Sequence, residues 1–317
     1  MSVPAARTRV ICVGHAALDR IFAVESWPQG SGKVPAHRFE ESGGGMAANA
    51  AAAIARLGGE AVFWGPIGED AVADAIHARL IADGVDVRGL RRFEGRTSSH
   101  SAVIVDESGE RLVVGYRGSA LQAPADWLPL DRIDLAGALL ADVRWPDGAC
   151  RALRAARDAG IPAILDAEIA AVEILAKLTC AADHVIFSER GLAAYSGGDS
   201  EGALRKVLAG GALMAAVTRG EHGVRWLEAA APGEVMHCPA FAVDTVDTLA
   251  AGDVFHGAYA LALAEGRGVG NAVRFAAAAA AIKCSRPGGR SGAPTRGEVE
   301  AFLASRKDGT RYIALRT

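Results

Sequence analysis

Short apolar runs alternate with longer alanine-rich stretches along most of this 317-residue chain. The runs have the length of buried β-strands, and the stretches between them have the length of helices. The predicted strands are 10–13, 61–64, 139–142, 163–166, 184–187 and 213–218. The predicted helices are 46–57, 71–83, 150–159, 203–209, 254–264, 271–283 and 296–305. This alternation favours an α/β fold, with a mostly parallel sheet between two layers of helices.

Two segments interrupt the alternation. Residues 19–41 contain two predicted short strands, 21–24 and 34–39, around a turn-rich middle. Residues 96–118 contain a predicted hairpin, with strands at 101–105 and 111–115 and a turn at 106–109. Four strands inserted between strand–helix units predict a small β-sheet lid. An extension of the main sheet at its edge is the alternative.

Charge and composition exclude several classes of partner. The 34 basic and 37 acidic residues give a net charge of −3, so no basic field attracts nucleic acid or anionic lipid. The five cysteines lie far apart, which argues against a disulfide framework or a zinc site. A secretory signal needs a longer apolar region than the run 10–13, so we expect none here, and the longest wholly apolar stretch, 275–282, is too short to span a membrane. We therefore expect a soluble, cytoplasmic protein with no nucleic-acid or membrane partner.

The ends of the predicted strands indicate where a ligand binds. A polar residue or a glycine stands at the end of several strands, as at Gly14, Asp142, Asp166, Ser188 and Arg219. In open α/β sheets the ligand crevice lies outside the carboxyl ends of the strands. Glycine is also unusually frequent, with 38 of 317 residues. We expect many of these glycines to line that crevice.

The segment 247–253, Asp-Thr-Leu-Ala-Ala-Gly-Asp, carries the strongest local signal. Its small residues precede an apolar helix, so their backbone N–H groups and the helix dipole form an anion site suited to phosphate. Asp253 would lie beside the anion, where a carboxylate can accept a proton from an attacking hydroxyl. The alternative is that Asp253 only caps the helix.

The segment Gly43-Gly44-Gly45-Met46-Ala47-Ala48-Asn49 opens another alanine-rich helix. It fits the G-x-G-x-x-A pattern of dinucleotide sites, but the polar residues 38–42 before it are not a buried parallel strand. The chain also has no Walker lysine motif. The glycines instead favour close approach of the backbone to a polyhydroxy ligand, with Asn49 hydrogen-bonding to it. A glycine turn without a ligand stays open as an alternative.

Weaker signals lie near other strand ends. Residues 218–223 follow a predicted buried strand and could border a nucleotide, and residues 284–292 form a glycine-rich loop. Arg144 and Lys33 could each bind an anion. Plain turns and solvated surface charges are the alternatives for these four features. The histidine spacing indicates no metal site.

Taken together, these motifs resemble those of the PfkB/ribokinase family of sugar kinases. Residues 43–49 with 55–58 look like the first signature of that family, and 65–70 resembles its G-x-x-G-x-D. Residues 247–253 look like its D-T-x-G-A-G-D signature. The resemblance implies a ribokinase-like three-layer α/β/α domain over residues 1–317, with a lid. It also implies ATP-dependent transfer of the γ-phosphoryl group to a primary hydroxyl of a sugar.

The resemblance assigns roles to particular positions. Asp253 would be the base, and the N–H groups of Ala250, Ala251 and Gly252 would stabilise the transferring phosphoryl group. The implied sugar-binding residues are Asp19, Gly44, Gly45 and Asn49, and the implied ATP-binding residues are Thr218, Gly220 and Gly223. Oxygens near Asp247 and in the loop containing Ser291 would bind a monovalent cation such as K⁺. Glu189 would assist Mg²⁺, and the lid would pair in a homodimer.

A finer resemblance points to kinases of 6-deoxy-6-sulfofructose, in which Lys33 and Arg144 would hold the sulfonate. The segments that carry it are 31–33, 140–145, 187–192 and 284–290. The chain departs from the pattern at Gly115, where those kinases have asparagine, at Ala250, where the family has glycine, and at 188–191, where the family has N-x-x-E. A fructokinase, another ketohexose or ribose kinase, and a catalytically impaired binding protein are the alternatives.

Overall fold

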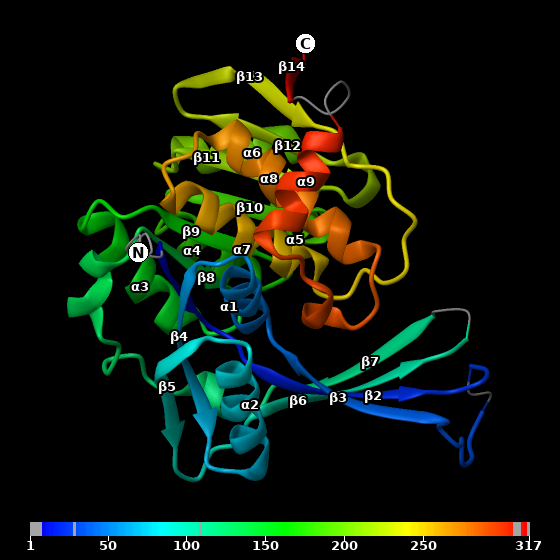
Figure 1. Cartoon of the computed structure of the whole chain (residues 1–317). Coiled ribbons are helices and arrows are strands. Elements are labelled where there is room, and N and C mark those ends of the chain that lie inside the picture. The colour runs from blue at the N-terminus through cyan, green and yellow to red at the C-terminus, as the bar shows by residue number, and fades with distance from the viewer. Residues whose placement is uncertain (1–7, 28–29, 108–109, 307–311, 316–317) are drawn as a thin grey trace, which may run out of the picture.

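A ten-stranded sheet forms the centre of the computed structural model, which describes residues 8–27, 30–107, 110–306 and 312–315 (Figure 1). The strand order is β14-β13-β12-β11-β10-β9-β8-β1-β4-β5. Neighbouring strands from β11 to β5 are parallel, and β12, β13 and β14 add antiparallel strands at the other edge. The bounds are β1 Arg9–Val13, β4 Glu60–Gly68, β5 Asp86–Phe93, β8 Ala138–Asp142, β9 Ala163–Ala167, β10 His184–Ser188, β11 Met214–Thr218, β12 Val224–Glu228, β13 Ala231–Cys238 and β14 Ile313–Leu315. The predicted mostly parallel sheet is confirmed.

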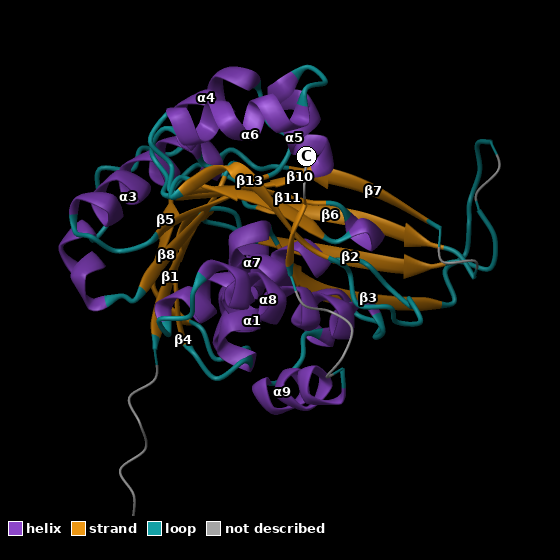
Figure 2. Ribbon diagram, turned by 90° about the horizontal axis from the view of Figure 1, so that it is seen from above, coloured by secondary structure: helices purple, strands orange, loops and turns teal. Residues whose placement is uncertain are grey.

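Helices cover both faces of this sheet (Figure 2). One face packs on α1 Met46–Arg56, α2 Ala71–Ala82, α7 Ala251–Ala264, α8 Val269–Cys284 and α9 Arg296–Ser305. The other face packs on α3 Pro146–Asp158, α4 Val172–Thr179, α5 Glu189–Ser196 and α6 Ser200–Ala209. Burial on both faces explains why the central strands are continuous apolar runs. Within the described ranges, no helix is long and apolar enough to cross a membrane.

Several helices begin earlier than the sequence patterns predict. Helix α3 begins at Pro146 rather than at 150, because proline fits the first turn of a helix, where its missing N–H is not needed. Helix α7 begins at Ala251 rather than at 254, so Asp253 lies inside its first turn. Helices α4 and α5 were not predicted. Each has 8 residues, about two turns, which is too short for an extended apolar period.

The lid is a separate four-stranded sheet, with strand order β3-β2-β6-β7. Its strands are β2 Ala17–Ala23, β3 Arg38–Gly44, β6 Ser99–Val105 and β7 Arg111–Tyr116. The lid is therefore confirmed, and the alternative of an extended main sheet is wrong. Strand β3 begins four residues later than predicted, at 38 instead of 34, and continues through Gly44. Its residues are largely exposed, so no apolar run marks it. Positions 108–109 of the predicted 106–109 turn lie outside the described residues.

The lid connects directly to the carboxyl ends of the strands of the main sheet. Only Gly14, His15 and Ala16 separate β1 from β2, and Gly45 alone separates β3 from α1. Figure 1 shows the four lid strands running outward together from the sheet. The site predicted at the carboxyl ends of the strands therefore lies at the base of the lid.

Candidate active site

Close packing of α1 against α7 brings the two signature motifs together. Helix α1 is mostly alanine, and Gly257 of α7 faces it: a Cβ at Gly257 would lie 2.5 Å from the carbonyl oxygen of Ala50. The small residues allow the helix backbones to approach, and Asn49 Nδ2 then donates a 2.7 Å hydrogen bond to Asp253 Oδ2. Two residues more than 200 positions apart in the sequence therefore share one polar contact.

Asp253 lies in the first turn of α7 and does not cap the helix. The N-cap of α7 is Ala250 and no side chain caps the helix, so the capping alternative is wrong. Burial, reinforced by the negative charge of Asp166, raises the pKa of Asp253 to about 7, although the hydrogen bond from Asn49 opposes the shift. A carboxylate with this pKa can accept a proton near neutral pH.

Ala250 bends the chain into the start of α7. Its φ of 62° lies in the left-handed region, and among the described residues it is the only non-glycine with positive φ. The bend lets the Ala251 N–H donate to the Thr248 carbonyl at 3.2 Å. This N–H is therefore already engaged inside the loop, in contrast to its predicted role. Gly252 is exposed, with open space where a Cβ would stand, and its N–H belongs to the first helical turn.

Asp247, at the other end of the same loop, is surrounded by donors. Its Oδ1 accepts from Leu249 N at 2.8 Å and from the guanidinium of Arg111, on lid strand β7, at 3.0 Å. Arg111 also donates to Thr248 Oγ1 at 2.8 Å, so the lid directly contacts the loop that precedes α7. The ammonium of Lys283 lies 3.2 Å from Asp247 Oδ2.

The pKa of Asp247 is lowered, opposite to that of Asp253. Burial by itself raises the pKa of Asp247, but hydrogen bonds from the Leu249 and Gly289 amides and the charge of Lys283 outweigh it. Ser291, the other predicted cation ligand, is exposed and donates to the Gly288 carbonyl at 2.5 Å.

The three consecutive glycines make room for protein groups at the end of β3. A Cβ at Gly43 would overlap the guanidinium of Arg290, and one at Gly44 would lie 2.2 Å from Asp19 Oδ2. Gly45 has a φ of 93°, and its Cβ would lie 2.5 Å from the His15 carbonyl oxygen. The close approach predicted for these glycines therefore occurs within the protein itself. Asp19 is held in place because Ser101 Oγ donates to its Oδ1 at 2.5 Å.

Unpartnered polar atoms lie at the junction of lid and sheet. Among the described residues, the buried side-chain atoms without a hydrogen-bond partner are His15 Nε2, Asn49 Oδ1 and His100 Nδ1. Leaving such an atom unpaired costs about 1–3 kcal/mol, so these atoms favour a polar ligand. His15 also accepts the Ala48 N–H through its carbonyl, which places it beside the start of α1. His15 was missed from the sequence, although its position directly after the first strand was a signal.

Asp142 organises this junction from beneath. Its Oδ2 accepts from the backbone N–H groups of His15 at 2.8 Å and Ala47 at 3.0 Å, and its Oδ1 accepts from Arg144 N at 2.8 Å. It therefore places a negative charge at the N-terminus of α1. Burial lowers the pKa of His15, and the charges of Arg144 and Arg117 lower it further. The negative charges of Asp142 and Asp19 act in the opposite direction.

The two predicted anion-binding residues are placed differently. Arg144 is half-buried and donates to the Ile169 carbonyl at 2.9 Å, and no acidic partner for it is found in the described part of the chain. Lys33 is exposed on the lid between β2 and β3. The structure thus brings Arg144, but not Lys33, to the junction around His15.

The predicted nucleotide-binding residues form the turn between β11 and β12. Thr218 ends β11 and donates to the Phe187 carbonyl at 3.3 Å. Gly220 has open space where a Cβ would stand. Gly223 instead faces β13, because its Cβ would lie 2.1 Å from the Cys238 carbonyl oxygen. Gly223 therefore serves the packing of the sheet edge.

The acids available to a divalent cation are scattered. Glu189 is exposed and pairs with Arg219 at 3.2 Å. Glu168 accepts from Ser188 Oγ at 3.0 Å, and Asp166 lies 3.3 Å from His256 Nδ1, with its pKa raised by burial and by Asp142. In the described ranges, no group of three or more potential ligands could hold a metal ion.

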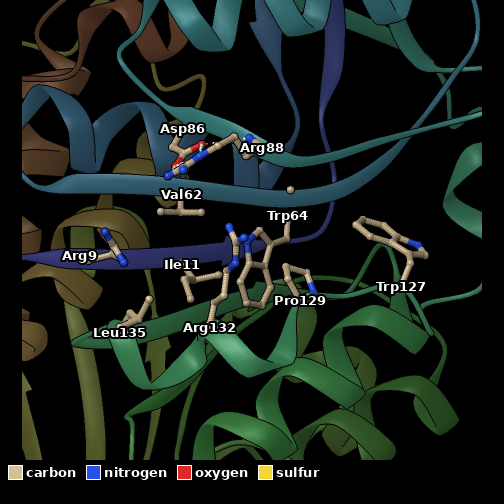
Figure 3. Close-up of a pocket in the computed structure, with 11 residues that line it drawn as sticks. Arg9, Ile11, Val62, Trp64, Asp86, Arg88, Trp127, Pro129, Arg132 and Leu135 are labelled. Carbon is tan, nitrogen blue, oxygen red and sulfur yellow. Dashed lines mark hydrogen bonds and ion pairs between the residues drawn. The ribbon is translucent and has the colours of Figure 1, made fainter.

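A cavity of about 450 Å³ lies on the face of the sheet opposite α1 (Figure 3). Its polar lining is largely paired within the protein, since Arg88 binds Asp86 and Arg9 binds Glu60. It includes none of the predicted site residues. The site at the base of the lid is therefore a different place.

Comparisons with known proteins agree with this geometry. The model of the pfkB family carbohydrate kinases matches residues 7–296. An ATP-dependent ribose-1-phosphate kinase from Halopiger xanaduensis is 31% identical over 309 residues, 95% of this chain and 99% of that protein. A solved structure from Agrobacterium tumefaciens, 40% identical, has a TM-score of 0.90 and covers 96% of this chain and 100% of that one. An Arabidopsis thaliana ribokinase solved with ribose and ATP is 26% identical, with a TM-score of 0.81, and covers 94% of this chain and 99% of that one.

Proposed function

Because this chain belongs to the pfkB family of carbohydrate kinases, we propose that it phosphorylates a primary hydroxyl of a ketose or ketose derivative. The observation that supports this most strongly is the contact of Asn49 with Asp253, whose pKa is raised to about 7. This contact supports Asp253 as the base, because a carboxyl group with this pKa titrates near neutral pH and lies in the first turn of α7, where an anion is stabilised.

The residues divide the reaction between two sides of the site. On the sugar side, Asp19, His15 and Asn49 offer polar atoms at the base of the lid. Asp253 accepts the proton of the sugar hydroxyl as the hydroxyl oxygen attacks the γ-phosphorus of ATP, and the bond from that phosphorus to the β,γ-bridging oxygen breaks to release ADP. The Gly252 N–H and the α7 dipole stabilise the charge on the transferring phosphoryl group. Arg111 holds the lid over this loop, which excludes competing water.

Mg²⁺ fits this site only with help from the nucleotide. Glu168 and Glu189 flank Ser188 and are the acids on that side. One or two carboxylates with phosphate oxygens and water are the usual ligands of Mg²⁺ in kinases, and the ion neutralises phosphate charge when bound. Glu189 would first have to leave Arg219. The Arabidopsis ribokinase, solved with ATP, supports ATP as the phosphoryl donor.

An anionic sugar is the finer proposal, with 6-deoxy-6-sulfofructose as the model substrate. It is supported by the half-buried Arg144 guanidinium and by the charge of Arg117 near His15. The Halopiger relative, named for ribose 1-phosphate, also takes a sugar that already carries an anion. Gly115 leaves open space opposite Ser101, so the sugar finds no side-chain donor there. A neutral ketohexose or ribose is the second candidate, because Gly115 adds no group to hold a sulfonate.

ADP release over a panel of acceptors tests both proposals. The panel contains fructose, 6-deoxy-6-sulfofructose, fructose phosphates, ribose, ribose 1-phosphate and nucleosides, with Mg²⁺ present. If none of these acceptors is phosphorylated, the kinase proposal is contradicted. Arg144→Ala should lower kcat/KM for an anionic sugar about 10-fold or more beyond its effect on fructose, since a charge-assisted contact is worth roughly 1.5–3 kcal/mol. Arg154→Ala, on the exposed side of α3, is the matched control. Equal losses for both sugars would exclude an anion-binding role.

We also propose that two copies pair through their lids. Strands β3 and β7 expose large apolar side chains, with Phe39, Val113 and Val114 each more than half exposed. Such a surface favours a protein contact. Sedimentation should show a dimer that Val114→Glu dissociates, whereas Leu213→Glu, at an exposed apolar residue outside the lid, should leave it intact.

A further inference from the structure

Lys283, near the end of α8, is completely buried. Lysine is almost never fully buried unless its charge is compensated. Here Nζ lies 2.7 Å from the Asp247 carbonyl oxygen, 3.2 Å from Asp247 Oδ2 and 3.4 Å from the Arg286 carbonyl oxygen. The three N–H groups of the ammonium therefore face three acceptor oxygens.

These oxygens form the donor set of a hard cation. Backbone carbonyls and a carboxylate are the ligands that replace the water shell of such ions in proteins. They come from Asp247 and from the loop after α8, the two places where the family resemblance implies a K⁺ site. The Lys283 ammonium already occupies the space between these oxygens, so the residues present do not fit an additional K⁺ ion.

Lys283 is linked through Asp247 to residues 247–250, the loop that precedes α7. Asp247 Oδ2 also accepts from the Gly288 and Gly289 amides, at 3.1 and 3.2 Å. Asp247 Oδ1 accepts from Leu249 N, directly before the bend at Ala250. Lys283 and Asp247 thus fasten the loop after α8 to the loop that starts α7. The first turn of α7, with Asp253, continues from this fastened segment.

We propose that the Lys283 ammonium acts as a built-in monovalent cation, which makes this enzyme independent of K⁺. Lys283 is a positioning residue, because it contacts the loop before Asp253 and not the reacting atoms. This inference rests on the proposed kinase function for its activity readout. Its stability readout does not depend on that function.

The first experiment uses the unaltered protein. Phosphoryl transfer and the thermal midpoint Tm are measured in K⁺, Na⁺ and tetramethylammonium chlorides at one ionic strength. We expect the same kcat and the same Tm in all three salts. A several-fold activation by K⁺, or a Tm raised by K⁺ alone, would overturn the proposal. Absence of turnover would count against the kinase function, whereas the Tm comparison would still test Lys283.

The second experiment removes the ammonium. Lys283→Ala should lower kcat about 10-fold or more, since small displacements of a catalytic loop are costly. It should also open a cavity that K⁺ can enter, so K⁺ should restore activity and raise Tm, whereas tetramethylammonium should do neither. Lys283→Met keeps the length of the side chain without opening that space, and we expect loss without rescue. Lys177→Met, on the exposed side of α4, controls for removal of a lysine. Wild-type kcat and Tm in Lys283→Met would refute the role.

Discussion

Asp247 lies in the loop before α7 and Asp253 in the first turn of that helix, yet their environments shift their pKa values in opposite directions. Burial by itself would raise the pKa of both carboxyl groups. For Asp247, hydrogen bonds from the Leu249 and Gly289 amides and the charge of Lys283 outweigh burial and bring the pKa below its usual value. For Asp253, burial and the nearby Asp166 raise the pKa to about 7, because among the described residues only the Asn49 amide donates a hydrogen bond to its side chain. The number of donors, rather than burial, sets the opposite pKa shifts, which fit a fixed anion at Asp247 and the proposed base at Asp253.

The sharpest test of this contrast is removal of the base. Asp253→Asn keeps the shape of the side chain and its place beside Asn49, but it cannot accept the proton. We expect kcat to fall by about 10²–10⁴-fold, the usual contribution of a general base, with little change in ATP affinity. Steady-state kinetics and ATP titration measure the two effects.

The exposed Asp244, in the segment before this loop, provides the control. Asp244→Asn removes the same charge and should leave kcat unchanged. Undiminished turnover in Asp253→Asn would exclude Asp253 as the base.

The second test compares stability, where the two carboxylates should respond with opposite sign. Asp247→Asn leaves the buried Lys283 without its anion and should lower the free energy of unfolding by about 3 kcal/mol. Asp253→Asn removes a charge that folding desolvates, so at pH 8 it should raise that free energy by on the order of 2 kcal/mol. Denaturant titrations at pH 8 measure both values. If both substitutions changed the free energy of unfolding in the same direction, the contrast between the two carboxylates would be wrong.

The third test uses pH. The Asp253 carboxyl must be ionised to act as a base, so kcat/KM should rise with pH and level off above about 7. The same raised pKa means that the folded state holds this proton more tightly than the unfolded chain does. Its stabilising effect is therefore present at low pH and lost as pH rises from 3.8 through about 7. The stability difference between Asp253→Asn and the parent should grow over that window.

Asp247 should behave in the opposite way. Its pKa is lowered, so the stability it contributes is present above 3.8 and lost as pH falls through its lower folded value. An acidic limb of kcat/KM that stays in place in Asp247→Asn would assign the limb to Asp253. A limb that disappears in that variant would assign it to Asp247 instead.

The smallest expected effect concerns the bend between the two carboxylates. Ala250 holds a left-handed backbone, which costs an alanine about 1 kcal/mol relative to glycine. Ala250→Gly should therefore raise the free energy of unfolding by about 0.5–1 kcal/mol and keep the activity. Ala229→Gly replaces an alanine in another turn, where φ is not positive, and should be slightly destabilising. A loss of stability in Ala250→Gly would show that the methyl group packs favourably.

The fold could be predicted from sequence because buried parallel strands leave apolar runs, and the lid because it interrupts their rhythm. Asp253, Asn49 and Gly252 could be predicted because small residues at a helix start have a local signature. His15, Lys283 and Arg111 could not be assigned, since their roles depend on contacts between distant segments. Lys283 in particular resembles an ordinary lysine near the end of a helix, where such residues are common. The contact that defines it is with Asp247, in another loop.

Strand β3 is part of the lid and also leads directly into helix α1. It begins in the lid, and its last residues, Gly43 and Gly44, lie against Arg290 and Asp19 before Gly45 starts α1. Gly45 alone separates this lid strand from α1, the helix that carries the proposed sugar-binding residue Asn49. Any movement of the lid would therefore also displace the start of α1. If the sugar binds where we propose, its capture and the closure of the lid are one mechanical event, and the product leaves only when the lid reopens.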